Sequence, residues 1–165
     1  IFYYRNGQIR KKTGFTDNIF DGEFIKYHDN GQIQKQQFFK NGVADGQYIS
    51  YYENGQINEK MLLKKDAIDG DYINYYENGV VNETASYKDG KPHGEFIIYF
   101  QNGKIENYTK CENGKREGEY RGYYESGVLE QIGNYIDGKL HGIVKIYNED
   151  GTFKEEERYE NGEQI

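Results

Sequence analysis

The sequence predicts an all-β protein: an elongated, single-layer antiparallel β-meander of 24-residue hairpin repeats. Two glycine series and the absence of a helical pattern support this fold class. One series runs through Gly7, Gly31, Gly55, Gly79, Gly103, Gly127 and Gly151. The other runs through Gly22, Gly46, Gly70, Gly94, Gly118 and Gly142 with the same spacing. No segment shows a sustained apolar period of about 3.6 residues, as an amphipathic helix would.

Each repeat is numbered here from the second glycine series, so that Gly46 stands at position 1. Position 6 is then tyrosine in every repeat: Tyr3, Tyr27, Tyr51, Tyr75, Tyr99, Tyr123 and Tyr147. Position 12 is always apolar: Ile9, Ile33, Ile57, Val81, Ile105, Leu129 and Phe153. The period covers residues 1–165, which we expect to form a single repeat domain of about seven hairpins, the first one partial.

Each repeat is interpreted as two short strands joined by a turn. The first strand follows the position-1 glycine and leads to the tyrosine of position 6. An Asn-Gly turn or an equivalent comes next, which is a strong hairpin signal. The second strand begins at position 12. A third glycine series, formed by Gly42, Gly90, Gly114, Gly138 and Gly162 and interrupted at Asp66, marks the turn to the next repeat.

The length of the Asn-Gly turn determines which side chains share a face. A three-residue loop with a glycine bulge pairs position 6 with position 12, whereas a two-residue loop pairs position 7 with position 12. Position 7 varies more than position 6, so we favour the three-residue loop. Alternation along the strands then predicts positions 4, 6, 12 and 18 on one face, as a stabilising apolar ladder, and positions 3 and 7 on the other.

The charge balance excludes some classes of partner. The chain has 21 Lys and Arg residues against 28 Asp and Glu residues, for a net charge of −7. Nucleic acid and anionic membrane surfaces require clusters of basic residues, which the sequence does not show. We therefore expect no nucleic-acid binding and disfavour membrane lipid as a partner.

The sequence offers no catalytic, metal or cofactor site. Cys111 is the single cysteine, which excludes an internal disulfide framework. His93 and His141 stand two repeats apart, roughly 19 Å at about 4.8 Å per strand, so one metal ion cannot bridge them. The glycines recur with the hairpins and form no phosphate loop. We expect no enzyme activity, no cofactor and no metal.

The repeat resembles a known family. Gly70 to Gly94, with Tyr75, Tyr76 and Asn78, and Gly118 to Gly142 match Gly-x-Tyr/Phe-x-x-Tyr-Tyr-x-Asn-Gly-x-Ile followed by Tyr-x-Asp/Asn-Gly-Lys-x-x-Gly. This pattern is similar to the bacterial, antitoxin-like variant of the MORN repeat. The resemblance covers essentially the whole chain and implies successive hairpins in one sheet with a scaffold or binding role. Departures from the pattern stand at Asn18, Asp66, His28, Asn148, Arg121 and Lys145.

The sequence is compatible with two functions. The first is a protein-binding scaffold, because repeat arrays offer long surfaces and aromatic residues are enriched at interaction hot spots. The alternative is a cell-surface module that binds a glycan or a cell-wall ligand, against which the absence of Trp counts. For both, the candidate binding residues are aromatic side chains at positions 3 and 7, whose other interpretation is simple sheet packing: Tyr52, Tyr76, Phe100, Tyr124, Tyr48 and Tyr72.

The ends of the sequence suggest continuation. Because the chain opens with Ile1 and not with Met, we expect the intact protein to extend beyond the N-terminus. The sequence leaves the cellular location open and slightly favours export, to a periplasm or cell surface, over the cytoplasm. Unpaired strand edges predict weak edge-to-edge self-association.

Overall fold

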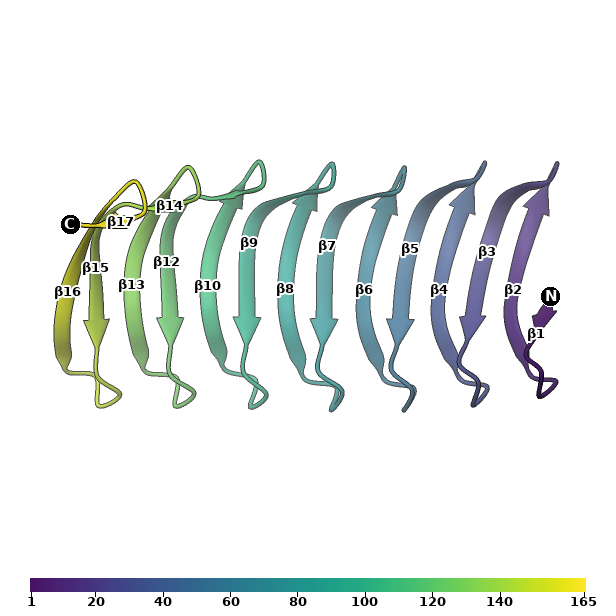
Figure 1. Cartoon of the computed structure of the whole chain (residues 1–165), viewed down its shortest axis with the longest axis horizontal. Helices are drawn as coiled ribbons and strands as arrows, with labels where there is room; N and C mark the ends of the chain where they lie inside the picture. Colours follow the sequence, from purple (N-terminus) through teal and green to yellow (C-terminus); the bar gives the residue numbers. More distant parts are fainter. The chain divides into compact units, whose positions relative to one another are not determined.

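The computed structural model describes residues 1–165 as strands and turns without a helix. It comprises two compact units, Ile1–Val80 and Val81–Ile165. Within each unit, successive antiparallel hairpins follow one another in a single open layer (Figure 1). The predicted all-β hairpin-repeat fold is confirmed. No helix of the length and apolarity needed to span a bilayer is present.

In the first unit, each strand pairs with the next strand in the sequence. The strands are β1 (Phe2–Tyr3), β2 (Ile9–Thr16), β3 (Ile19–Tyr27), β4 (Ile33–Lys40), β5 (Val43–Tyr51), β6 (Ile57–Lys64) and β7 (Ala67–Tyr75).

The second unit continues the pattern with interruptions. Its strands are β8 (Val81–Lys88), β9 (Lys91–Tyr99), β10 (Ile105–Glu112), β11 (Lys115–Arg116), β12 (Gly118–Tyr123), β13 (Leu129–Ile136), β14 (Lys139–Leu140), β15 (Gly142–Tyr147), β16 (Phe153–Glu160) and β17 (Glu163–Gln164). Strands β11 and β12 both pair with β10 and are separated only by Glu117. They therefore correspond to one strand of the predicted repeat.

The Asn-Gly turn is a three-residue loop, as predicted. In the hairpin of β3 and β4, the N–H of His28 donates to the carbonyl of Gln32 at 2.7 Å, and that of Gly31 donates back to His28 at 3.1 Å. Gly31 has a φ of 88°, a left-handed conformation that favours glycine. The side chain of Asn30 accepts from the N–H of Gln32 at 2.9 Å, which closes the loop. Tyr27 consequently pairs with Ile33, position 6 with position 12.

The turn between repeats has two residues. Asn41 and Gly42 have φ values of 51° and 83°, the two positive angles of a type I′ turn. Asp66, which interrupts the glycine series, adopts a φ of 67°. Its carboxylate accepts from the N–H of Ala44 at 2.8 Å, so this departure from the repeat pattern gains a hydrogen bond to the preceding repeat.

A second bulge corrects the predicted assignment of faces. Tyr27 pairs with Ile33, but Lys26 pairs with Lys35, which leaves Gln34 as an extra residue at position 13. The extra residue shifts the alternation beyond position 12 by one. Position 18 therefore lies on the face of position 3, and its predicted place beside positions 4, 6 and 12 was wrong. The same bulge recurs in the other hairpins, as in β5 and β6 at Asn58.

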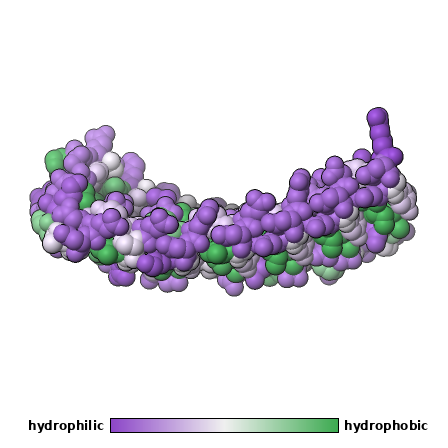
Figure 2. Space-filling model, turned by 90° about the horizontal axis from the view of Figure 1, so that it is seen from below, coloured by the Kyte–Doolittle hydropathy of each residue, from purple (hydrophilic) through white to green (hydrophobic).

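The two faces differ in burial. We call the face with positions 3, 5, 14, 16, 18 and 23 the core face, and the face with positions 2, 4, 6, 12, 15 and 17 the ladder face. The side chains that are almost completely buried all lie on the core face: Ala44, Ser50, Ala85, Thr109, Tyr120 and Val144. The predicted apolar ladder of positions 4, 6 and 12 thus does not contain the most buried side chains. Polar residues cover most of the surface seen in Figure 2, with apolar patches between them.

Aromatic stacking consolidates the core face in the first unit. The ring of Phe20 stacks on Phe15 with centroids 4.7 Å apart and lies 5.4 Å from the ring of Phe39. Phe24 contacts Phe39 edge to face at 6.1 Å. On the ladder face, position 6 is half-buried in all repeats except the first, where Tyr3 is exposed. The Tyr51 hydroxyl, for example, donates to Gln36 at 2.9 Å.

Candidate interaction surface

The candidate aromatic residues fall into two groups on the structure. Tyr48 and Tyr72 stand at position 3, in the middle of strands β5 and β7 on the core face. The candidates at position 7 follow the last residue of a strand and begin the hairpin loop: Tyr52, Tyr76, Phe100 and Tyr124. All of these side chains are half-buried.

The position-7 residues connect successive repeats. The hydroxyl of Tyr52 donates to the carbonyl of Tyr75 at 2.6 Å, and that of Tyr124 donates to Tyr147 at 2.9 Å. His28 makes the equivalent contact through Nε2, 3.2 Å from the carbonyl of Tyr51. Phe100 has no hydroxyl and cannot make it. The hydroxyls of Tyr52 and Tyr124 therefore already bind within the sheet, which favours a structural role for them.

The asparagine of the Asn-Gly turn supports the same connection. Asn54 donates from its amide to the carbonyl of Glu77 at 3.1 Å, while its side-chain oxygen accepts from the N–H of Gln56 at 2.9 Å. Asn6, Asn30 and Asn102 donate to the next repeat in the same way. One side chain thus closes its own loop and holds the following hairpin.

Tyr48 and Tyr72 border a polar group on the core face. The carboxylate of Glu59 accepts from the hydroxyls of Ser50 and Tyr72, each at 3.3 Å. Burial raises the pKa of the Tyr48 phenol, and the nearby charge of Glu59 raises it further. Tyr48 is therefore a neutral hydrogen-bonding group at ordinary pH. The rings of both tyrosines are half-buried.

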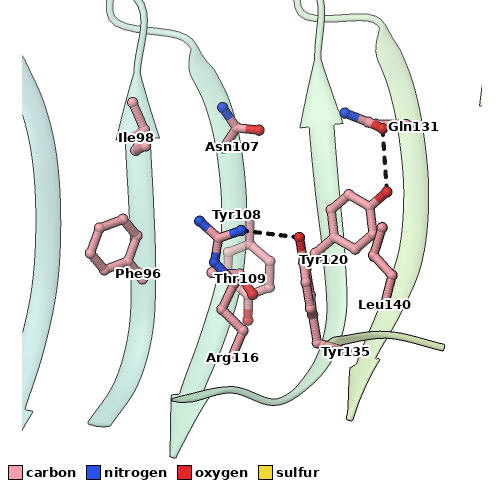
Figure 3. A pocket seen from close by; sticks show the side chains of 10 residues that line it. All are labelled: Phe96, Ile98, Asn107, Tyr108, Thr109, Arg116, Tyr120, Gln131, Tyr135 and Leu140. Carbon is pink, nitrogen blue, oxygen red and sulfur yellow. Dashed lines mark hydrogen bonds between the residues drawn. The ribbon is translucent and has the colours of Figure 1, made fainter. Parts of the chain in front are cut away.

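The second unit contains a hollow that the sequence analysis missed. It has a volume of about 300 Å³ and lies on the core face of β9 to β14. Phe96 and Tyr120 line it from neighbouring repeats, with Asn107 and Gln131 toward one end and Arg116 toward the other (Figure 3). The hollow thus combines aromatic walls with a cation and two amides.

Hydrogen bonds and stacking fix the walls of this hollow. The guanidinium of Arg116 lies 5.3 Å from the ring centroid of Tyr135 and donates to its hydroxyl at 3.0 Å. The rings of Tyr120 and Tyr135 lie 5.1 Å apart, and the Tyr120 hydroxyl donates to Gln131 at 3.3 Å (Figure 3). Burial raises the pKa of Tyr120 to about 12. The site is therefore pre-formed and positively charged at one end.

Small residues beside the position-3 aromatic residues leave space for the hollow. Thr109 occupies position 16, where Thr13, Gln37 and Met61 stand in the first unit. Gly122 occupies position 5, and Gly133 lies directly below the ring of Tyr120. The signal in the sequence was a small residue at position 16, Thr109, and at position 5, Gly122. This signal can be interpreted only once the bulge is known, because the bulge places position 16 beside position 3.

No group of three or more His, Cys, Asp or Glu side chains is arranged to hold a metal ion. Cys111 is free and half-buried, and burial raises the pKa of its thiol. The surface offers aromatic rings for stacking, and polar and charged groups for hydrogen bonding and ion pairing.

Successive β-hairpins in a single layer, joined by hydrogen bonds between repeats, define a repeat protein of the interaction-module type. The MORN repeat variant family matches the chain in six segments, residues 20–41, 44–65, 68–89, 92–109, 116–137 and 140–161, and the chain belongs to this family. Such repeats generally serve as scaffolds and as interaction modules for proteins or membranes. No curated protein is similar enough to the chain to count as a match.

Proposed function

We propose that the protein is a non-enzymatic scaffold that binds a protein partner through the aromatic core face. The hollow between Phe96 and Tyr120 is the observation that carries this proposal. Its volume of about 300 Å³ lies at the lower limit of small-molecule pockets and suits one large side chain of a partner. Tyrosine and arginine, which line it, are the residue types enriched at interaction hot spots.

The hollow favours an aromatic anchor on the partner. An inserted ring would stack on Phe96 and Tyr120. The guanidinium of Arg116 would donate hydrogen bonds to a carbonyl or carboxylate of the same segment, and a carboxylate would also pair with its charge. In the first unit, Tyr48 and Tyr72 present half-buried aromatic rings on the core face. Of the position-7 residues, Tyr52 and Tyr124 contribute ring faces only, because their hydroxyls are engaged.

A membrane is a less suitable partner than a protein. The net charge of −7 opposes attraction to an anionic lipid surface. Exposed carboxylate residues also recur in the hairpin loops, at Asp29, Glu53, Glu77 and Glu125. A protein segment can match a small cationic site without approaching these loops closely.

Glycan binding is the second candidate function. The amides of Asn107 and Gln131 stand beside the aromatic rings of the hollow, and sugars combine stacking faces with hydroxyl groups. Trp is absent from the whole chain, which removes the broadest stacking platform. The absence of Trp therefore makes a protein the favoured partner.

Two arginines of one hairpin provide the test. Arg116 lines the hollow, whereas Arg121 points to the ladder face at position 4. We expect a cross-linked partner from the source organism to be retained by the wild-type protein and by Arg121→Gln, and to be lost with Arg116→Gln. Equal retention by both variants would contradict the proposal. Binding on a glycan array that only Arg116→Gln abolishes, without any protein partner, would support the second candidate.

A further inference from the structure

Three lysines form a continuous row on the core face of the first unit. Lys11 on β2 pairs directly with Lys26 on β3, and Lys26 pairs directly with Lys35 on β4. Paired residues of antiparallel strands point to the same face, and neighbouring strands lie about 4.8 Å apart. The three lysine side chains therefore project from backbone positions within roughly 10 Å of one another. The chain as a whole has a net charge of −7.

The lysines have no carboxylate partner. The ion pair of the first unit joins Lys64 to Asp69 and does not include any of the three. The ammonium of Lys11 lies 4.2 Å from the ring centroid of Phe2, and that of Lys35 lies 5.3 Å from Phe24 and 5.7 Å from Tyr48. The ammonium of Lys35 also donates a long hydrogen bond of 3.4 Å to the neutral amide of Gln37. Each of the three side chains is half-buried. Burial and the charge of Lys26 both lower the pKa of Lys35.

Folding alone does not favour this arrangement. Like charges directly opposite each other destabilise a pair of strands, and here two successive pairs carry the same charge. The rings of Phe24 and Tyr48 provide cation–π contacts, but these also fix the ammonium of Lys35 beside the row. The row is thus a cationic site whose repulsion an incoming anion would relieve.

The charges change sign further along the same row. Strand by strand, the positions after Lys35 are Ser50 on β5 and Glu59 on β6, as the cross-strand pairs show. Glu59 lies two strands beyond Lys35, roughly 10 Å away, and accepts from Ser50 and Tyr72. A ligand along the row therefore meets three positive groups, then a polar stretch, then a negative group.

We propose that the row of Lys11, Lys26 and Lys35 binds an acidic, extended segment of a protein partner that runs across strands β2 to β6. Alternate side chains of an extended segment lie about 6.5–7 Å apart on one side, so two or three carboxylates can reach the three flexible lysines. A serine or a basic residue further along the segment would match Ser50 and Glu59. This proposal rests on the proposed function and specifies the chemistry of the partner on the first unit.

The change of sign favours a short acidic segment over larger anions. A membrane surface or a nucleic-acid backbone carries negative charge over much more than the roughly 10 Å that the lysines span, and either would also face Glu59. A peptide can place its acidic residues over the lysines and a basic residue over Glu59.

The test uses a defined probe and the full chain. The probe is a fluorescein-labelled peptide with Glu at three alternate positions, Ser between them and a Lys after a Gly-Ser spacer, and the reference peptide has Gln in place of Glu. Fluorescence anisotropy compares the wild-type protein with the double variant Lys26→Gln/Lys35→Gln. Lys12→Gln is the matched control, because Lys12 is adjacent to Lys11 but pairs with Ile25 on the ladder face.

We expect the double variant to bind the acidic peptide about five- to tenfold more weakly and Lys12→Gln to bind it as the wild type does. Binding should also weaken with rising salt. Equal binding of the Gln peptide, or equal losses in the double variant and Lys12→Gln, would overturn the proposal. Tighter binding of phosphatidylserine vesicles than of the peptide, lost in the double variant, would also overturn it and indicate a membrane.

Thermal unfolding separates a binding site from a structural one. Removal of like charges should raise the melting temperature of the double variant while its peptide affinity falls. A lower melting temperature would show that the lysines stabilise the sheet and would contradict the proposal. A failure here leaves the partner test on Arg116 unaffected, since that residue belongs to the hollow of the second unit.

Discussion

At the scale of single residues, the aromatic side chains divide into those that connect repeats and those that form the core face. Tyr52 and Tyr124 use their hydroxyls on the following repeat. Tyr120 packs against Tyr135 and is only 9% exposed. The same amino acid thus has different roles that depend on its position in the repeat.

The connecting hydroxyl can be removed in one repeat and introduced in another. Tyr52→Phe loses the hydrogen bond to the Tyr75 carbonyl and should lower the free energy of unfolding by about 0.5–1.5 kcal/mol. Phe100→Tyr places a donor where the repeat pattern has a carbonyl acceptor and should be neutral or stabilising. Urea denaturation measures both variants, and a strong destabilisation by Phe100→Tyr would contradict this role.

Gly133 allows the close approach of Tyr120 and Val144. A Cβ atom at this residue would lie 2.5 Å from a ring carbon of Tyr120 and 2.9 Å from a methyl carbon of Val144. Gly133→Ala should therefore destabilise the protein by about 1–3 kcal/mol through overpacking. Thermal unfolding checks this value, and an unchanged melting temperature would show that the ring is not held against the backbone.

Tyr120 should also make stability depend on pH in the alkaline range. Its pKa is about 12 in the folded protein, against 10.0 for an ordinary tyrosine, because burial favours the neutral phenol. The unfolded chain ionises first, so this contribution to stability is complete below pH 10 and is lost as the pH rises toward 12. Stability curves of the wild type and Tyr120→Phe should converge over this range, and parallel curves would contradict the shift.

At the scale of the elements, the hairpin is defined by one loop and one bulge. The loop was predictable, because the invariant tyrosine at position 6 and the apolar position 12 indicated their pairing. The bulge at position 13 was not, because this position varies among polar and charged residues such as Gln34, Asn58 and Glu106 and has no glycine. One extra residue moved position 18, one of the four predicted ladder positions, to the opposite face.

The turn asparagine tests how the hairpins are held together. Asn54→Ala removes the bond that closes its own loop and the bond to Glu77 of the next repeat, and should cost about 1–2 kcal/mol. Glu53→Ala changes an exposed neighbour in the same loop and should remain within about 0.5 kcal/mol of the wild type. Urea denaturation measures both variants. Similar losses in the two would argue against a stabilising role of the Asn54 hydrogen bonds.

At the scale of the whole molecule, the sequence period was sufficient to predict the fold class and the family. The period gives each repeat the same turns, and each hairpin can bury its surface only against its neighbours. The binding surface was less predictable. Position 7 stood out because it is aromatic in most repeats, whereas the hollow of the second unit depends on small residues, Thr109 and Gly122, whose face the bulge determines.

The central claim is that the core face, and not the face with the invariant tyrosine, carries the stabilising layer. Tyr120 and Tyr123 test it most directly, because they lie on the same strand, β12, on opposite faces. The measurement is the free energy of unfolding of Tyr120→Ala and Tyr123→Ala. We predict a loss of about 3–5 kcal/mol for Tyr120→Ala and a clearly smaller loss for Tyr123→Ala. An equal or larger loss for Tyr123→Ala would contradict the account.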